Sequence, residues 1–304
     1  MNDPRARLGF LALIGGATGI GFAPVLVRLS ETGPTATAFF RLLFALPLLW
    51  IWAGWERRNN PTSRQPAGRK DFLLLALAGL FFTGDLSIWH WSLQFTTVAN
   101  STLLTNFTPI FVTIGAWFLF EDRVTPGFVA GMALSIGGAA LLVRNSVSLG
   151  SQHLLGDALS LVAAVFYAGY LLALKHLRRS FSTASIMAWS GLVSCTGFGI
   201  VAWLSGDRMA AATTGGWLVL LALALISHVG GQALIAYGFG HLPASFSSVS
   251  LLWQPVVAAT VAWVVLGERL RWLQGIGAVV VLAGSAVASG TLNAGNRPPG
   301  NQRR

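Results

Sequence analysis

Residues 109–138 read PIFVTIGAWFLFEDRVTPGFVAGMALSIGG, and residues 255–284 read PVVAATVAWVVLGERLRWLQGIGAVVVLAG. Identical residues recur between the two stretches at a constant offset of 146 positions, and no gap is needed to align them. The matching pairs are Pro109 and Pro255, Trp117 and Trp263, Arg123 and Arg269, Gly131 and Gly277, and Gly138 and Gly284. The chain therefore contains an internal repeat, and this repeat decides the fold.

The same register extends toward the N-terminus with little slippage. Gly9 and Arg28 lie 147 residues before Gly156 and Lys175. Each half contains five long apolar segments, so the second half must enter the membrane from the opposite side. We therefore expect an all-α membrane protein with ten transmembrane helices in two inverted five-helix repeats. Secondary transporters recurrently use this design, with the substrate site at the repeat interface.

The composition supports this class, because 10% of the residues are charged and 54% are hydrophobic, whereas soluble domains carry about 25% charge. Ten segments of roughly 20 residues are long and apolar enough to cross the bilayer. They lie near residues 8–29, 36–55, 71–92, 98–119, 126–143, 155–175, 184–205, 215–238, 246–266 and 272–290. We assign residues 1–145 to the first repeat and 146–292 to the second. Residues 293–304 are polar and without periodicity, so we expect a disordered cytoplasmic tail.

The net charge of +10 is better explained by topology than by a nucleic-acid partner. With the N-terminus inside, fourteen of the 20 Lys and Arg residues fall on the inner side and five on the outer side, and Arg41 lies within the second span. The positive-inside rule then places both termini in the cytoplasm. A cleaved signal peptide is an alternative for the first segment, but the repeat requires this segment as the partner of the sixth span.

The sequence carries none of the common catalytic, phosphate-binding or metal-binding signatures, so we expect no catalytic residue, metal or cofactor. The acidic residues fall at span ends or in loops, except Asp85, which lies well inside the third span. One buried carboxylate does not make a paired acid–base site. Cys195 stands alone in mid-span and forms no disulfide framework.

Asp85 is the leading candidate for a substrate site, because ionisable residues inside a membrane are costly and usually face a cavity or a partner. Trp89 follows it by one helical turn on the same face. The matching face of the eighth span carries His228 and Gln232. The alternatives are that Asp85 caps a helix or pairs with Arg41, and that His228 satisfies only a local carbonyl group. Arg41 is then an ion-pair partner or a side chain that extends to the interface.

The fourth and ninth spans each carry polar residues immediately before a proline. Proline within a span frees a carbonyl group and can kink the helix. We expect Asn106 before Pro109, and Trp253 and Gln254 before Pro255, to line the cavity. Most Ser and Thr residues in these spans are expected only to help helices pack. The remaining candidates are aromatic and are expected to form the cavity walls: Trp89 and Trp91, Phe22 of the first span, and Tyr167 and Tyr170 of the sixth.

The repeated pattern resembles the EamA-type half of the drug/metabolite transporter superfamily. In both halves a proline is followed, after eleven residues, by Glu121-Asp122-Arg123 or Gly267-Glu268-Arg269, and then by two spaced glycines. The first half departs from the usual Gly-Glu pair. The resemblance covers essentially the whole chain and implies a multi-pass protein of the bacterial inner membrane that exports amino acids or other metabolites. The Trp-rich interior is similar to the branch that exports aromatic amino acids.

The sequence thus predicts a secondary transporter that exports small metabolites by alternating access, with amino acids as the expected class. The alternatives are a multidrug or nucleotide-sugar carrier of the same superfamily, or a membrane enzyme acting on lipid-linked substrates. The expected partners are a small-molecule substrate and the lipid bilayer, without nucleic acid. A monomer is compatible with these expectations. The exact substrate, the coupling ion, the oligomeric state and the side to which the cavity opens are left open by the sequence.

Overall fold

The structure is a computed structural model, and it describes residues 4–60, 64–92, 94–96, 101, 104–122, 124–143, 153–267 and 272–295. All regular secondary structure in this part of the chain is helical. The helices of the first half are α1 (Pro4–Gly21), α2 (Ala23–Arg28), α3 (Pro34–Asn59), α4 (Arg69–Ser92), α6 (Thr108–Phe120) and α7 (Pro126–Val143). Those of the second half are α8 (Leu154–Leu177), α9 (Thr183–Leu204), α10 (Thr214–Ala222), the π-helix η3 (Leu223–Gln232), α11 (Ala233–His241), α12 (Ala244–Ser250), the 3₁₀ turn η4 (Leu251–Trp253), α13 (Gln254–Leu266) and α14 (Trp272–Gly295).

Seven helical segments of the described chain are long and apolar enough to cross a membrane, and they agree with seven of the predicted spans. They are Pro4–Arg28, Pro34–Asn59, Arg69–Ser92, Leu154–Leu177, Thr183–Leu204, Thr214–His241 and Ala244–Leu266. Shorter apolar helices, Thr108–Phe120, Pro126–Leu141 and Gly275–Ala288, lie where the fourth, fifth and tenth spans are predicted. A multi-pass all-helical membrane protein is therefore confirmed, and the count of ten spans stays a prediction.

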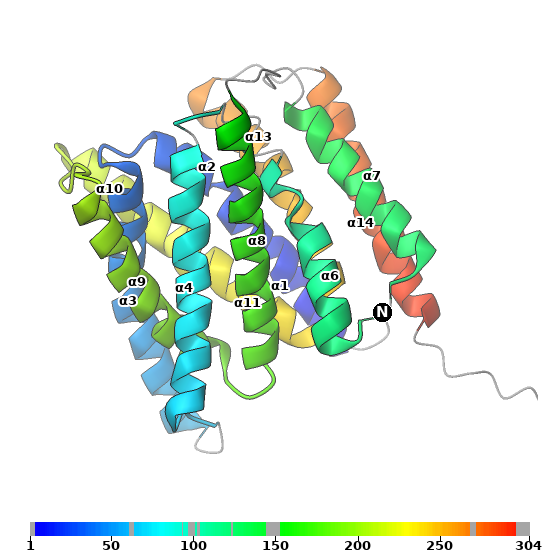
Figure 1. Cartoon of the computed structure of the whole chain (residues 1–304), viewed down its shortest axis with the longest axis horizontal. Coiled ribbons are helices and arrows are strands. Elements are labelled where there is room, and N and C mark those ends of the chain that lie inside the picture. The colour runs from blue at the N-terminus through cyan, green and yellow to red at the C-terminus, as the bar shows by residue number, and fades with distance from the viewer. Residues whose placement is uncertain are drawn as a thin grey trace, which may run out of the picture.

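The helices pair mostly between the two halves of the chain. Helices α3 and α9 pack together at one edge of the bundle, and α7 and α14 lie side by side at the opposite edge (Figure 1). Between these edges α4 packs against α8, and α1 packs against η3 and α11. Each half therefore completes the packing of the other, and the space between the halves lies at the centre of the bundle.

The α7–α14 pair shows how closely the repeats fit. A Cβ atom added to Gly131 would lie 2.7 Å from the carbonyl oxygen of Gly284, and one added to Gly138 would lie 2.8 Å from that of Gly277. The two helices thus touch backbone to backbone, as small residues allow in membranes. The contacts are reciprocal: Gly131 meets the repeat partner of Gly138, and Gly138 meets the repeat partner of Gly131.

Three spans are interrupted next to a proline, as the sequence predicts for the fourth and ninth spans. Asn106 lies in a turn before α6, and η4 ends one residue before α13, which begins with Gln254 and Pro255. The third break, at Phe22 before Pro24, separates α1 from α2. The eighth span contains the π-helix η3 instead of a proline. π-Helical turns within α-helices are frequent at functional sites.

Helix ends repeat between the halves as well. Helix α6 ends at Glu121, whose φ of 58° is left-handed, and α13 ends at Gly267 with a φ of 68°. Glycine adopts this conformation without steric cost, so Gly267 is the favourable residue and Glu121 the strained one. The departure from Gly-Glu in the first half therefore preserves the backbone conformation of the turn.

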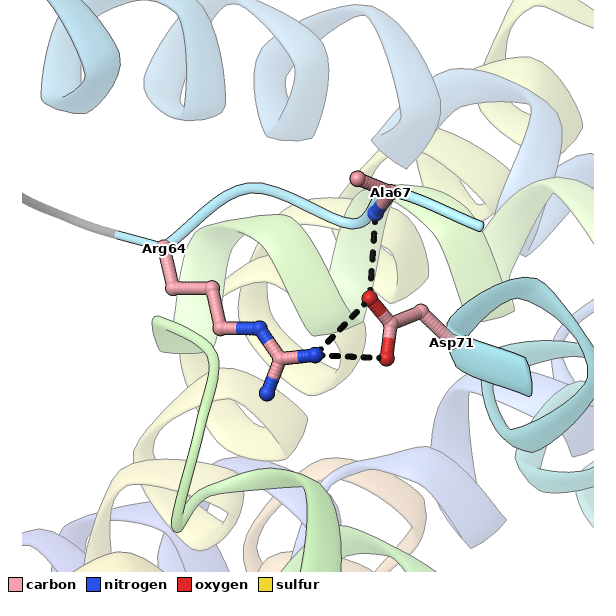
Figure 2. A network of polar contacts seen from close by, with 3 residues as sticks. All are labelled: Arg64, Ala67 and Asp71. Atoms are coloured by element: carbon pink, nitrogen blue, oxygen red, sulfur yellow. Dashed lines mark hydrogen bonds and ion pairs between the residues drawn. The ribbon is translucent and has the colours of Figure 1, made fainter. Parts of the chain in front are cut away.

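The connection before α4 is held against that helix by one ion pair. The Arg64 guanidinium lies 2.9 Å from the Asp71 carboxylate, which also accepts a hydrogen bond from the backbone N–H of Ala67 at 3.0 Å (Figure 2). Asp71 lies in the first turn of α4, where a negative charge is favourable. The pair therefore fastens the polar connection between α3 and α4 to the first turn of α4.

Candidate functional site

A cavity of about 230 Å³ lies at the centre of the bundle. Its walls come from both halves: α2, α3, α4 and the start of α6 from the first, and α8, η3, α12 and α13 from the second. A site for one water needs only about 10–15 Å³ on this scale. The cavity is therefore large enough for a small metabolite rather than only for a few ordered waters.

Six of the eleven residues predicted for the substrate site line this cavity, namely Asp85, Trp89, Asn106, Tyr167, Gln232 and Gln254. They come from five predicted spans, two in the first half and three in the second, and only the tertiary fold brings them together. The structure thus gathers a carboxylate, three amides and two aromatic side chains around one space. Their role in substrate binding stays a prediction.

Three of the other predicted residues lie one layer behind the cavity wall. Tyr170 is buried, and its ring centroid lies 4.9 Å from that of Phe82, which does line the cavity. The ring of His228 lies 5.8 Å from the same Phe82, and neither ring nitrogen of His228 has a hydrogen-bond partner among the described residues. Phe22 packs against Val25, Val257 and Val261. These side chains support the wall rather than form it.

Trp253 is likewise removed from the cavity lining. Its indole Nε1 donates a hydrogen bond to Thr18 Oγ1 at 3.1 Å, and its ring packs against both apolar clusters of the core. Trp253 therefore joins the ninth span to α1. Its role in packing is shown, and its predicted contact with substrate stays a prediction.

Trp91 is the clearest correction. Its side chain is 56% exposed and does not line the cavity. Helical geometry explains this position, because each residue turns the helix by about 100° and Trp91, six residues after Asp85, points about 120° away from it. An exposed aromatic side chain near the end of a span fits the membrane–water interface, where tryptophan is enriched.

The cavity also contains residues that the sequence left outside the predicted site. Arg41 of α3 lines it with only 6% of its side chain exposed, so it does not extend to the membrane interface. His90 and Thr105 line it too. A charged residue within an apolar span is the signal that could have selected Arg41, but its sequence partner in the second half carries no charge.

The side of the bundle that holds the start of α12 is closed by two contacts between the halves and by one contact within the second half. The Asp122 carboxylate accepts hydrogen bonds from the backbone N–H and the hydroxyl group of Ser245, at 3.3 and 3.2 Å. Lys175 Nζ donates to the carbonyl oxygen of Leu242 at 2.6 Å. The rings of Phe10 and Phe246 stack at 5.9 Å. These contacts lie at the opposite end of the bundle from the loop residues 29–33, toward which the cavity extends.

Asp122 belongs to the repeated acidic motif, and it bonds Ser245 at the start of α12 in the other half. Glu268, its repeat counterpart, lies outside the described residues, as does Arg123.

Comparison with known families decides the class of protein. The model of the EamA-like transporter family matches residues 7–144 and again residues 154–290. The chain belongs to the EamA-like transporter family. Its two halves are therefore two copies of the EamA unit, and the resemblance stated from the sequence is confirmed. Family membership marks the chain as a transporter of the membrane rather than as an enzyme.

Relatives and a solved structure agree with this assignment. A Salmonella typhimurium protein named "Probable amino-acid metabolite efflux pump" is 30% identical over 294 residues, which cover 91% of this chain and 92% of that protein. An Archaeoglobus fulgidus protein named "Uncharacterized transporter" is 24% identical, covering 86% of this chain and 90% of that protein. A crystal structure titled only as that of a protein superposes with a TM-score of 0.77 at 18% identity, covering 95% of this chain and 99% of that one. This last likeness shows the fold alone.

Proposed function

We propose that this EamA-family protein is a secondary transporter of the bacterial inner membrane that exports small metabolites, amino acids in particular, by alternating access. The observation that carries the proposal is the central cavity, because both EamA units contribute its walls. A site at the interface between two repeats can be exposed to either side when one repeat moves against the other.

The proposal includes ten spans in two inverted five-helix units, with both termini in the cytoplasm. The reciprocal contacts of Gly131 with Gly284 and of Gly138 with Gly277 support it, because a two-fold relation makes each contact occur twice. The first and sixth spans make a second pair of equivalent contacts. Gly9 of the first span lies beside Leu242, and Gly156 of the sixth span lies beside Thr96. In this orientation the closed end at Ser245 faces the cytoplasm, and the cavity extends toward the outside.

Amino acids are proposed as the substrate class on two grounds. The cavity combines aromatic walls with a carboxylate, an arginine and three amides, a mixture suited to a small molecule that is polar at one end and apolar at the other. Relatives carry names that refer to amino-acid export, among them the Salmonella protein and a 27% identical Streptantibioticus cattleyicolor protein named "Probable terminal-alkyne amino-acid exporter".

The test is efflux from proteoliposomes that contain the purified protein and are loaded with single radiolabelled amino acids. We expect release to exceed that from protein-free liposomes for large neutral amino acids, with the released molecule chemically unchanged. Release of dyes or nucleotide sugars without release of any amino acid would favour the alternative carriers. Chemical conversion of a lipid-linked substrate would favour an enzyme. Reporter fusions at both termini test the orientation, and reporters active on opposite sides would contradict it.

A further inference from the structure

The cavity contains two side chains of opposite formal charge, and no other Asp, Glu, Lys or Arg among the described residues lines it. Arg41 comes from α3 and Asp85 from α4, and their side chains are 6% and 8% exposed. Transferring either charge from water into a protein interior is costly unless a partner or water compensates it. The arrangement therefore needs a compensating group.

The protein itself supplies little compensation to either charge. Arg41 makes one hydrogen bond, from Nη2 to the carbonyl oxygen of Ser227 at 3.4 Å, and its Nε has no partner. The Asp85 carboxylate has no hydrogen bond or ion pair with a described residue, and it is not within 4.0 Å of the Arg41 guanidinium nitrogens. Asp71, by contrast, is held by Arg64 and a backbone N–H. Arg41 and Asp85 are therefore left facing the cavity.

Three neutral side chains around the cavity also have a nitrogen without a partner among the described residues. The side-chain amides of Asn106, Gln232 and Gln254 line it, and each has a buried nitrogen without a hydrogen-bond partner. Buried polar groups normally find a partner, so such a group at a cavity points to a ligand or to water. Together with Arg41 these groups offer several N–H donors, whereas Asp85 offers the single charged acceptor.

A carboxylate fits the donor-rich part of this cavity, because its two oxygens accept several hydrogen bonds and pair well with a guanidinium group. An ammonium group, which has three donors and no acceptor, fits Asp85. A free α-amino acid carries both groups on neighbouring atoms, and its side chain would pack on the walls formed by Phe82, Trp89 and Tyr167.

We propose that Arg41 binds the carboxylate and Asp85 the ammonium group of a zwitterionic α-amino acid, so that this pair selects amino acids over amines and carboxylic acids. The inference rests on the proposed function and adds to it the two residues that define the substrate class.

The experiment uses three probes that share one side chain: L-phenylalanine, phenethylamine, which lacks the carboxylate, and 3-phenylpropionate, which lacks the ammonium group. Binding to the purified full-length protein is measured by ligand-induced thermal stabilisation and by competition with phenylalanine efflux. For the wild type we expect each analogue to bind about tenfold or more weakly than phenylalanine, since hydrogen bonds between charged groups are the strong ones.

The variants separate the two roles. Arg41→Gln should weaken phenylalanine about tenfold or more and leave phenethylamine nearly unchanged, so that the preference for the amino acid over the amine disappears. Asp85→Asn should instead abolish the preference for phenylalanine over 3-phenylpropionate. Each preference is a ratio measured within one variant, so a change in expression does not affect it. If Arg41→Gln does not fold, Arg41→Lys keeps the charge and should retain part of the preference.

Arg64→Gln and Asp71→Asn are the matched controls, because they make the same substitutions in an arginine–aspartate pair away from the cavity (Figure 2). Both controls should keep the wild-type preferences. An equal loss for phenylalanine and phenethylamine in Arg41→Gln would overturn the proposal and make Arg41 a structural residue. A wild type that exports phenylalanine but prefers neither analogue would also overturn it, whereas a wild type that exports no amino acid would refute the proposed function itself.

Discussion

Trp253 and Gln254 are neighbours in the chain but have different surroundings. Gln254 lines the cavity, with Nε2 lacking a partner. Trp253 donates its indole N–H to Thr18 and packs in the core. The break in the ninth span at this point explains the difference, because Trp253 ends the 3₁₀ turn η4 and Gln254 begins α13.

Replacing these two residues by alanine should therefore affect different properties. Gln254→Ala should lower amino-acid efflux about three- to tenfold with little change in thermal stability, since it removes one ligand hydrogen bond worth about 0.5–1.5 kcal/mol. Trp253→Ala should lower the melting temperature in detergent, because it loses packing and a hydrogen bond that together are worth about 3 kcal/mol. Equal effects of both changes on efflux at equal stability would show that Trp253 also contacts substrate.

At the scale of the helix, α7 and α14 depend on glycines for their contact. Gly138 lies against the backbone of α14, with an added Cβ only 2.6 Å from Val281 N, whereas an added Cβ at Gly137 meets nothing within 4 Å. The two neighbouring glycines therefore differ only in the face of α7 on which they lie.

Gly138→Ala should destabilise the protein by about 1–3 kcal/mol, because the two helix backbones must separate to admit the methyl group. Gly137→Ala is the matched control, and it should leave stability unchanged or raise it by up to about 1 kcal/mol through helix propensity. Thermal unfolding of both variants in one detergent measures the difference. Equal melting temperatures would contradict the close α7–α14 packing.

Glu31 and Asp207 lie in two different loops between spans. Each caps the helix that follows the other residue's loop: Glu31 caps α10, and Asp207 caps α3. Glu31 accepts hydrogen bonds from the backbone N–H groups of Ala212 and Thr213 and from the Thr213 hydroxyl, at 2.7, 2.9 and 2.6 Å, next to the start of α10. Asp207 accepts from the backbone N–H groups of Thr35 and Ala36, at 2.8 and 3.0 Å, in the first turn of α3. The hydrogen bond from the Thr213 side chain, followed by the other hydrogen bonds, lowers the pKa of Glu31.

A lowered carboxylate pKa predicts a defined acid dependence. The contribution of Glu31 to stability should be fully present above the ordinary glutamate pKa of about 4.3 and should be lost as the pH falls through the lowered folded-state pKa. Glu31→Gln should remove this component of the stability profile measured between about pH 3 and 6. Glu121→Gln changes an exposed glutamate and should retain it. An unchanged profile in Glu31→Gln would mean that the cap does not contribute to stability.

At the scale of the whole molecule, the cavity is closed at one end by Asp122 with Ser245 and by Lys175 with the Leu242 carbonyl group. The Asp122–Ser245 bonds join the two EamA units, whereas Lys175 and Leu242 belong to the same unit. The Asp122–Ser245 bonds therefore have to break when the cavity opens toward that end. Their removal should therefore shift the population of the two conformations rather than change the cavity itself.

Asp122→Ala should expose the cavity to the cytoplasmic side more often. The reporter is Ser248→Cys, a cavity position, in a Cys195→Ser background that removes the native thiol. We expect labelling from the cytoplasmic side by a membrane-impermeant maleimide to rise about tenfold, because a hydrogen bond to a charged group contributes about 1.5–3 kcal/mol. Asp157→Ala, which removes a carboxylate bonded to Thr96 at the other end, is the control and should not raise it. Unchanged labelling in Asp122→Ala would exclude these bonds from the closure.

The sequence determined that this is a multi-pass membrane protein. The length of its apolar segments and the uneven distribution of its charges are properties of the linear chain, so they can be read without tertiary contacts. Long uncharged segments predict helices in a bilayer wherever they pack, and the ungapped register of Pro109 with Pro255 predicts two equivalent units. The break before each proline followed from local backbone chemistry as well. Asp85 was selected because an isolated carboxylate in an apolar segment is visible without any tertiary contact.

The tertiary structure alone decided which side chains share the cavity. Trp89 lies on the Asp85 face of α4 and Trp91 does not, as helical periodicity predicts, but only the packing of α4 in the bundle turns the Asp85 face toward the cavity and leaves Trp91 exposed. Arg41 lies at the cavity because α3 packs beside η3, which is a contact between residues far apart in the chain. Burial depends on such distant neighbours, so the sequence could name the charged groups inside the membrane but not the space that they face.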